Sequence, residues 1–328
     1  MQMAASIYVA GAGTLVGAAI RRALQRQGYR NLVGGPAEEP ECSDAHQVEA
    51  FFAHTSPEYV FLAAGKSGGI GANQRFPADL LLDNLLVACH VIRSAYAHGV
   101  KKLLYLASSC SYPKHCPQPM RVQSLLTGPL EPTNKAYAIA KLAGIALCQA
   151  YRQQYGAPFI SGIPANPFGP GDDFSPENAH VIGALMHKMH DAKVRGLRTV
   201  EVWGTGAVRR EFIFADDLAE ACICVMRSYD GQEPINLGSG MDQSIRELAA
   251  CLAEVVGFDG ELRFDASKPD GIPQKILDSS CLRALGWRPK TPFRAALAAT
   301  YAWFRQAEAK GGSHVHTPLY GGSPRDLP

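Results

Sequence analysis

The feature that most constrains the fold is a short apolar run that leads into a helical pattern through a glycine-rich turn. Residues 6–13 read SIYVAGAG, and residues 17–28 (GAAIRRALQRQG) carry apolar side chains every three or four positions. The first pattern is typical of a buried strand, and the second is typical of a helix with one apolar face. The chain therefore begins with a strand that enters a helix.

The same alternation continues through the first half of the chain. We expect further strands at 59–65, 101–109 and 158–166, and long helices at 79–99 and 134–156. Strands that are joined through helices run parallel, with the helices covering both faces of the sheet. The sequence thus predicts an α/β fold built on a Rossmann-like, doubly wound parallel sheet.

After residue 167 the expected elements become shorter and are interleaved with Pro and Gly. We predict a dinucleotide-binding Rossmann domain over 1–166, to which later elements return, and a smaller C-terminal α/β substrate-binding part over 167–310. Residues 311–328 are expected to form a loose tail. The smaller part would include a helix at 177–193, a strand at 199–204, the segment 210–226 and a helix at 244–257.

Composition argues against several classes of partner and site. Charged residues make up 19% of the chain and the formal net charge is +2, without a basic stripe, so we expect no nucleic-acid partner. The N-terminus lacks a basic segment before an extended apolar one, and we find no ~20-residue uncharged apolar run, so we expect no membrane association. The nine cysteines form no C-x-x-C pair, which favours reduced thiols over a metal site or disulfides. A cytoplasmic protein fits best.

The turn after the first strand, GAGTLVG (11–17), is suited to a dinucleotide. Glycines let the backbone approach a pyrophosphate, and the N-terminus of the following helix favours an anion. A G-x-x-G-x-x-G pattern would place glycine at position 14, where this chain has Thr14, and Gly13 comes one position early. A purely structural tight turn remains an alternative at this point.

In folds of this kind the end of the second strand bears on the choice between NAD(H) and NADP(H), and here the relevant stretch is NLVGGPAEEPECSD (31–44). An acidic side chain there accepts a hydrogen bond from a ribose hydroxyl, whereas an arginine pairs with a 2′-phosphate. The loop has no arginine and contains Glu38, Glu39 and Glu41, which favours NAD(H). A solvated acidic loop is the alternative.

Tyr137 and Lys141 stand four residues apart in an expected helix and therefore share one face. An ammonium beside a phenol favours the phenolate, so we expect Lys141 to lower the pKa of Tyr137 and to let it exchange a proton with a substrate oxygen. Ser108 stands at the end of a preceding strand. The three residues together indicate proton transfer coupled to hydride transfer.

Five longer segments resemble the extended short-chain dehydrogenase/reductases, and among them the GDP-L-fucose synthases. They are 101–114 (KKLLYLASSCSYPK), 125–156 (LLTGPLEPTNKAYAIAKLAGIALCQAYRQQYG), 177–185 (ENAHVIGAL), 202–221 (VWGTGAVRREFIFADDLAEA) and 264–278 (FDASKPDGIPQKILD). The resemblance implies NAD(P)H-dependent 3,5-epimerisation and 4-keto reduction of a GDP-4-keto-6-deoxy-mannose-type sugar. The product would be GDP-L-fucose or a close analogue.

The resemblance also implies roles for single residues. Ser108, Tyr137 and Lys141 would serve reduction at C4, and Cys110 and His180 would move protons at C3 and C5. The implied cofactor-binding residues are Gly11, Gly13, Thr14, Gly17, Ala63, Ala64, Tyr137, Lys141, Pro164, Asn166 and His180. The implied substrate-binding residues are Ser109, Val181, Leu185, Val202, Trp203, Arg210 and Lys275. No metal is implied.

Elementary chemistry agrees with this set. A C–H bond beside a ketone is acidic because the charge spreads into an enolate, and inversion needs a proton to leave and return on opposite faces. A thiol and an imidazole both titrate near neutrality and suit that task. Taken alone, Cys110 could equally be packing, His180 a polar surface residue and Trp203 a core aromatic.

Members of the resembled family usually prefer NADP(H), which they hold with one arginine in the Gly-rich turn and another after the second strand. This chain has Ala12 in the turn and no arginine in the loop. Either NAD(H) serves, or Arg21 or Arg22 folds back onto the 2′-phosphate, or NADP(H) is held weakly. The Thr14 side chain would narrow the approach to the pyrophosphate, and Pro167 would lie beside the nicotinamide.

Two other functions stay open from the residues alone. One is a nucleotide-sugar 4-epimerase or dehydratase with tightly bound NAD, which would need neither Cys110 nor His180. The other is a non-catalytic dinucleotide-binding protein. By resemblance the chain would form a homodimer through the helices at 79–99 and 134–156.

Overall fold

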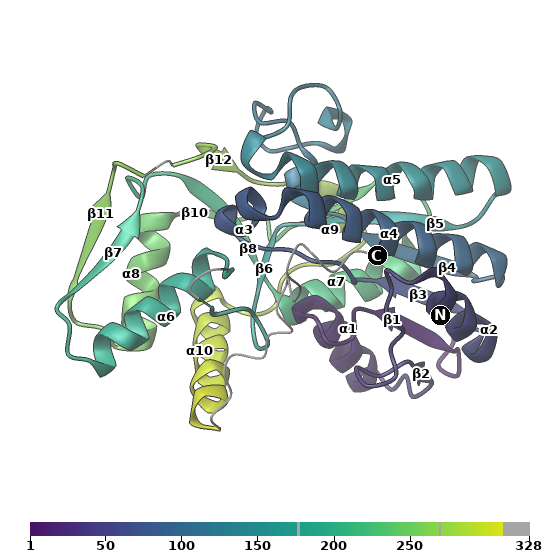
Figure 1. The fold of residues 1–328 in the computed structure, drawn as a ribbon, viewed down its shortest axis with the longest axis horizontal. Coiled ribbons are helices and arrows are strands. Elements are labelled where there is room, and N and C mark those ends of the chain that lie inside the picture. The colour runs from purple at the N-terminus through teal and green to yellow at the C-terminus, as the bar shows by residue number, and fades with distance from the viewer. Residues whose placement is uncertain (176–177, 269, 311–328) are drawn as a thin grey trace, which may run out of the picture.

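Six parallel strands form the central sheet of the larger of two lobes (Figure 1). The computed structural model describes residues 1–175, 178–268 and 270–310, so the tail expected at 311–328 lies outside the described residues. The strand order is β2-β1-β3-β4-β5-β9. The strands are β1 (Ile7–Ala10), β2 (Leu32–Val33), β3 (Tyr59–Leu62), β4 (Lys102–Leu106), β5 (Phe159–Pro164) and β9 (Ile235–Leu237).

Helices cover both faces of this sheet, which confirms the predicted doubly wound fold (Figure 1). Helix α4 packs on α5, and α1 packs on α7, and these two pairs lie on opposite faces. The helices of this lobe are α1 (Leu15–Arg26), α2 (Ala45–Thr55), α3 (Ile70–Arg75), α4 (Pro77–Ala97), α5 (Lys135–Tyr155), α7 (Ala215–Ser228) and α9 (Ser280–Ala284), with 3-10 turns η1 (Ser109–Ser111), η2 (Val122–Ser124) and η3 (Pro132–Asn134).

The strand order reverses between β1 and β3. From β1 the chain moves outward to β2, and it then returns to the other side of β1 to build β3, β4 and β5. In open sheets of this kind, ligands bind at the carboxyl ends of the strands at such a reversal. The Gly-rich turn after β1 and the segment that begins at Ser108 after β4 both leave the sheet at that edge.

Local sequence explains the long helices. Pro77 occupies the first position of α4 with Asp79 in the same turn, and both suit a helix N-terminus. Gly99, with φ 68°, follows the end of α4, and Gly156, also with φ 68°, ends α5, which agrees with the expected helix ends at 99 and 156. Helix α4 has the length and mean hydropathy (1.3 over 18 residues) of a membrane span. Eight of its residues are buried, however, and helices in the core of ordinary folded proteins share these properties.

The smaller lobe collects short strands around β8 and places three helices about a second apolar core. Strand β8 pairs with β6, β10 and β12, and β7 pairs with β11. The elements are β6 (Asn166–Phe168), α6 (Val181–Val194), β7 (Thr199–Trp203), β8 (Arg209–Phe214), β10 (Asp242–Ser244), α8 (Ile245–Val256), β11 (Glu261–Asp265), β12 (Gln274–Lys275) and α10 (Phe293–Ala309). Helix α8 begins with a capping box between Ser244 and Glu247.

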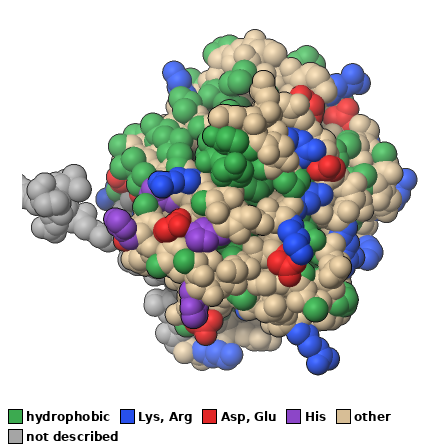
Figure 2. Space-filling model, turned by 90° about the vertical axis from the view of Figure 1, so that its right-hand side faces the viewer, with side chains coloured by type: hydrophobic (Ala, Val, Ile, Leu, Met, Phe, Trp, Pro, Cys, Tyr) green, Lys and Arg blue, Asp and Glu red, His purple; other side chains and the backbone are tan. Residues whose placement is uncertain are grey.

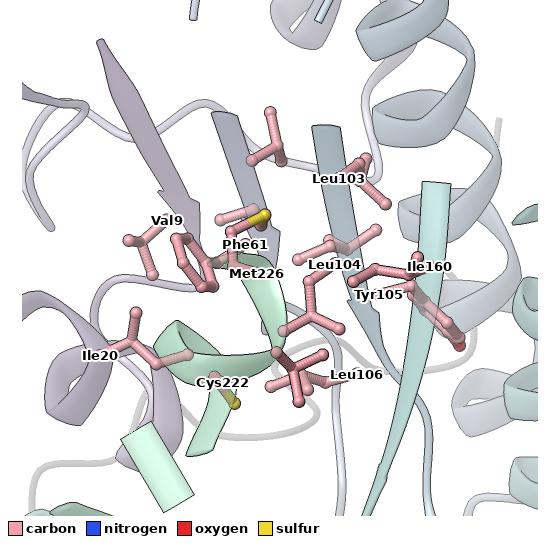
Figure 3. Close-up of a cluster of buried hydrophobic side chains, with 14 of the residues drawn as sticks. Val9, Ile20, Phe61, Leu103, Leu104, Tyr105, Leu106, Ile160, Cys222 and Met226 are labelled. Atoms are coloured by element: carbon pink, nitrogen blue, oxygen red, sulfur yellow. The ribbon is translucent and has the colours of Figure 1, made fainter. Parts of the chain in front are cut away.

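One segment was assigned to the wrong lobe. The sequence analysis places 210–226 in the smaller part, but only β8 lies there. Helix α7 turns its buried face, including Cys222 and Met226, onto the central sheet of the larger lobe (Figure 3). Arg22 on α1 pairs with Asp216 on α7 at 2.8 Å. Local sequence carries no information about which sheet such a segment covers.

Candidate active site

The Gly-rich turn brings β1, α1 and the end of β3 into close contact. Gly11 has φ 85°, and a Cβ atom on it would lie 2.6 Å from the Ala64 nitrogen; a Cβ on Gly17 would lie 1.9 Å from the Gly11 oxygen. Gly13 is exposed, and its nearest neighbour would be 4.0 Å away, on Pro36. Gly11 and Gly17 are therefore required by close approach, whereas Gly13 is not.

Thr14 has a role that the sequence analysis missed. Its hydroxyl donates to the Gly11 oxygen at 2.8 Å and accepts from the Gly17 nitrogen at 3.1 Å, so it is the N-cap of α1. A serine or threonine before a helical pattern is the signal that would have found it. The N-terminal helix amides keep the orientation that suits a pyrophosphate.

The acidic loop after β2 folds onto the turn. The Glu39 carboxylate accepts hydrogen bonds from the Gly11 and Ala12 amides, the second at 3.0 Å, and from the Tyr8 hydroxyl at 3.4 Å. Burial raises the pKa of Glu39, although these hydrogen bonds oppose the shift. Glu39 is therefore a half-buried part of the cofactor turn rather than a residue of a fully solvated loop.

Ser108 and Tyr137 meet at the carboxyl end of β4. The Ser108 hydroxyl hydrogen-bonds the Tyr137 phenol, and it also accepts from the Cys110 nitrogen at 3.2 Å. Ser108 thereby caps the turn η1 that displays Cys110. The structure thus joins the predicted reduction residue to the segment that carries the predicted proton-transfer thiol.

The expected effect of Lys141 on Tyr137 is not observed. Burial raises the pKa of the Tyr137 phenol, the nearby Cys110 sulfur raises it further, and the hydrogen bond from Ser108 opposes the change. The Lys141 ammonium lies 5.7 Å from the centre of the Tyr137 ring and donates to the Leu106 carbonyl at 3.3 Å. The two side chains share a helix face, as predicted, but the hydrogen bond of the ammonium goes to the Leu106 carbonyl.

A dinucleotide would find buried polar groups beside Lys141. Burial lowers the pKa of Lys141 to about 8. A Cβ on Gly65 would lie 2.4 Å from the Asn84 Oδ1 atom and 3.5 Å from the Lys141 Nζ atom, and Asn84 Oδ1 is buried without a hydrogen-bond partner. This orphaned acceptor and the space that Gly65 leaves fit a polar group such as the nicotinamide ribose. Among the described residues, no cluster of His, Cys, Asp and Glu could hold a metal.

Cys110 contacts two nitrogen donors from distant segments. Its Sγ atom lies 3.1 Å from Asn134 Nδ2 and 3.6 Å from Lys275 Nζ. The cysteine is half-buried in a recess after β4, so it is not a core packing residue. Asn134 was missed as a site residue. Its only sequence signal is its position directly before the helix that carries Tyr137.

His180 was expected within a helix over 177–193. In the structure it is instead the N-cap residue of α6. Its side chain reaches solvent, yet the surrounding protein atoms lower the pKa of the imidazole. Asp173 raises this pKa and Lys275 lowers it further, so both charges lie near the ring. Lys275 therefore acts electrostatically on His180 and contacts Cys110.

The residues predicted to hold the nucleotide differ in exposure. Trp203 is 62% exposed, with Lys188 Nζ and Lys268 Nζ 5.7 and 5.5 Å from its ring, so it is not a core aromatic. Leu185 and Val202 belong to the second apolar core, with 5% and 2% exposure, and the half-buried Val181 packs against it. The side chains of Leu185 and Val202 offer a base little free surface.

The remaining predicted residues lie around the same edge. The Arg210 guanidinium is held by the Arg209 and Ile272 carbonyl oxygens at 2.8 and 2.6 Å. Arg209, left unassigned by the sequence analysis, forms ion pairs with Asp242 and Glu247. Ser109 is buried in the recess beside Cys110. Pro164 ends β5, and the Asn166 side-chain amide donates to the Glu211 backbone carbonyl oxygen at 2.7 Å.

Comparison with known proteins agrees with this architecture. The profile of the NAD dependent epimerase/dehydratase family matches residues 7–238. The chain belongs to this family. GDP-L-fucose synthase 1 of Arabidopsis thaliana is 54% identical over 300 residues, which cover 92% of this chain and 93% of that protein. GDP-L-fucose synthase of Escherichia coli K12 is 46% identical over 307 residues, covering 91% and 96%.

Within the epimerase/dehydratase family, a solved structure also matches the chain closely. The GDP-mannoheptose C4 reductase MlghC of Campylobacter jejuni, with NADP bound, has a TM-score of 0.85 and 34% identity, covering 93% of this chain and 99% of that one. The family resemblance inferred from the sequence is confirmed. The roles of the individual site residues stay predictions.

Proposed function

We propose that this epimerase/dehydratase-family chain converts a GDP-linked 4-keto-6-deoxy-mannose-type sugar into GDP-L-fucose or a close analogue. The reaction would comprise 3,5-epimerisation followed by NAD(P)H-dependent reduction of the C4 ketone. The observation that carries the proposal is that the groups for reduction and for epimerisation lie together at the carboxyl end of β4. Ser108 bonds Tyr137 for reduction, and two residues further on Cys110 faces a recess that also holds Lys275, which acts electrostatically on His180. High identity to GDP-L-fucose synthases supports the same activity.

Each epimerisation moves one proton off and one proton onto a carbon beside the C4 ketone. In the proposed step, a base takes the proton, and the electron pair of the C–H bond passes into the enolate. Cys110 and His180 would be the two groups: the Cys110 thiolate would take the proton, and protonated His180 would return one to the opposite face, with solvent restoring both protonation states. The lowered pKa of His180 makes its protonated form a stronger proton donor.

In the reduction, Tyr137 would give its phenolic proton to the C4 oxygen, with Ser108 orienting both. Its raised pKa makes Tyr137 a stable proton carrier before the step. The dinucleotide supplies the hydride when bound. Gly11, Gly17 and Lys141 would hold it, and Asn84 would satisfy its orphaned carbonyl oxygen there.

The choice between NADP(H) and NAD(H) would depend on Arg21. The Arg21 guanidinium donates to the Gly34 oxygen at 2.9 Å, at the end of β2 where a 2′-phosphate is read. Arg22, the other candidate from the sequence, instead pairs with Asp216 on α7. We infer that Arg21 replaces the missing loop arginines and that NADP(H) is bound.

Titration of the purified protein with NADPH and NADH tests this cofactor assignment. Arg21→Gln should weaken NADPH binding at least ~10-fold, the effect of one charge-assisted contact, and leave NADH binding unchanged. Arg22→Gln, which removes the neighbouring charge, should change the affinities for NADPH and for NADH little and to the same extent. Equal NADPH affinity in the Arg21→Gln variant and the wild type would assign the 2′ site to other residues.

Turnover tests the main proposal. The protein is given GDP-4-keto-6-deoxymannose and reduced cofactor in D2O, and cofactor oxidation and deuterium at C3 and C5 are followed by absorbance and mass spectrometry. Both should be observed. Cys110→Ser should impair or misdirect epimerisation and leave some reduction of the unepimerised ketone. Neither deuterium exchange nor cofactor oxidation with this substrate would exclude the proposed reaction.

We further propose a cytoplasmic homodimer, with all nine cysteines as free thiols. Hydrophobic side chains gather in the upper half of the face drawn in Figure 2. Leu82 and Tyr96 on α4 and Ile139 and Tyr155 on α5 are 40–56% exposed, and the Tyr96 and Tyr155 rings stack at 4.5 Å. Ile139→Asp should halve the mass measured by light scattering. Val194→Asp, at an equally apolar exposed site on the smaller lobe, should not.

A further inference from the structure

The Cys110 sulfur lies where two separate parts of the chain present nitrogen donors to it. Asn134 comes from η3, directly before α5, and Lys275 comes from β12, 165 residues further along the chain than Cys110. Strand β12 pairs in parallel with β8, and the register sets Lys275 beside Arg210. The pairing of two smaller-lobe strands therefore delivers Lys275 to a thiol of the larger lobe.

The contacts of the two cations differ. Arg210 Nη1 donates to the backbone oxygens of Arg209 and Ile272, so both N–H groups of that nitrogen are engaged. Within the described part of the chain, the Cys110 sulfur is the hydrogen-bonding partner of the Lys275 ammonium. On the other side of the sulfur, Asn134 presents its amide nitrogen, a donor. Two donors on one sulfur suit an acceptor, and a thiolate is a much better acceptor than a thiol.

The other charged or titratable groups around the sulfur do not cancel this arrangement. Lys114 and Glu131 line the same recess but pair with each other at 3.1 Å. Tyr137 is neutral at working pH, and Arg210 adds a second positive charge within electrostatic range of Cys110. Lys275 and Asp173 both act electrostatically on His180. The charge that faces Cys110 is thus positive.

We propose that Lys275, assisted by Asn134, is a positioning residue that holds Cys110 as a thiolate in the substrate-free enzyme. On the proposed function, on which the use of this thiolate rests, the sulfur would then take a proton directly from a carbon beside the ketone. The S–H bond forms as the C–H bond breaks, and the electron pair passes into the enolate. The same ammonium lowers the pKa of His180, which makes protonated His180 a stronger donor of the returning proton.

The pH dependence of Cys110 alkylation by iodoacetamide tests this inference without substrate. The rate is read for the Cys110 peptide by mass spectrometry, which separates it from the other eight cysteines. Lys275→Met should move the midpoint of the rate profile upward by about one pH unit or more. At neutral pH the thiolate fraction then falls about tenfold, and the higher nucleophilicity of a more basic thiolate limits the loss in rate to about threefold.

Three further variants separate electrostatics from structure. Lys275→Arg keeps the charge and should keep the midpoint near that of the wild type. Asn134→Asp has the same shape, removes the donor and adds a negative charge, so it should raise the midpoint as well. Lys290→Met removes a lysine that is 73% exposed and paired with Glu220, and it should leave the profile unchanged.

The high-pH plateau reports whether iodoacetamide still reaches the sulfur. An unchanged midpoint in Lys275→Met, or a rate lowered equally at every pH, would overturn the inference and leave Lys275 with the substrate diphosphate alone. That result would not touch the proposed reaction, which the turnover assay decides. Conversely, a shifted midpoint in an enzyme without turnover would uphold the thiolate and refute the proposed function.

Discussion

The Lys141 ammonium lies 5.7 Å from the centre of the Tyr137 ring and bonds the Leu106 carbonyl rather than the phenol oxygen. Tyr137 therefore keeps its proton, because burial raises its pKa by more than the hydrogen bond from Ser108 lowers it. A phenol of this kind acts as a proton donor rather than as a standing phenolate. Tyr137 thus carries one proton for transfer, and Lys141 contributes a buried amine beside it.

Tyr137→Phe should stop reduction and spare epimerisation. Loss of a general acid lowers the rate by about 10²–10⁴, so cofactor oxidation should fall by that factor. Deuterium exchange at C3 and C5 should persist, because Cys110 and His180 are intact. Tyr155→Phe, an exposed tyrosine on the same helix, is the matched control. Loss of both activities in Tyr137→Phe would argue for one shared proton-transfer group.

Lys141→Met should change stability in a pH-dependent way. The pKa of Lys141 is lowered to about 8 in the folded protein by burial, whereas an unfolded lysine titrates near ~10.4. Between these values the unfolded chain binds more protons, so the wild type gains stability as the pH rises. The methionine variant should be more stable than the wild type below pH ~8, with the difference shrinking toward pH ~10.

The measurement is urea unfolding of both proteins from pH 7 to 10. Lys135→Met, which replaces an exposed lysine at the start of the same helix, serves as the control and should show no comparable trend. A constant difference between Lys141→Met and the wild type across this range would mean that burial of the ammonium carries no penalty.

Gly17→Ala should disrupt the turn after β1. Its Cβ would lie 1.9 Å from the Gly11 oxygen, a backbone atom that cannot move without shifting α1 from the sheet. We expect loss of NADPH binding in a calorimetric titration and a lower melting temperature. Gly13→Ala places its Cβ 4.0 Å from its nearest neighbour and should behave like the wild type. Equal binding by the two variants would contradict the close approach.

Met226→Ala should destabilise the larger lobe. Its side chain is 1% exposed between α7 and the central sheet, and removal of a buried methionine costs about 2–5 kcal/mol. Met241→Ala, at 65% exposure, should change the free energy of unfolding by less than ~0.5 kcal/mol. Urea unfolding monitored by circular dichroism measures both. Equal losses would place α7 outside the core.

Much of the fold follows from local pattern alone. The apolar runs that became β1, β3, β4 and β5, and the helices ended by Gly99 and Gly156, depend on periods and on glycine conformations within a few residues. The shared face of Tyr137 and Lys141 follows from the helical repeat in the same way. The long matching segments also identified the family, which the relatives confirm.

The tertiary structure decided what depends on distant partners. Neighbouring helix positions point about 100° apart, and only packing on α7 shows that Arg22 pairs with Asp216 while Arg21 turns to the β2 loop. The pairing of β12 with β8 brings Lys275 to Cys110 across 165 positions. The sequence by itself determined the elements and their chemistry, because these obey short-range rules. Strand register and helix packing decided which charges face the Cys110 thiol. Both arise only when the whole chain is folded.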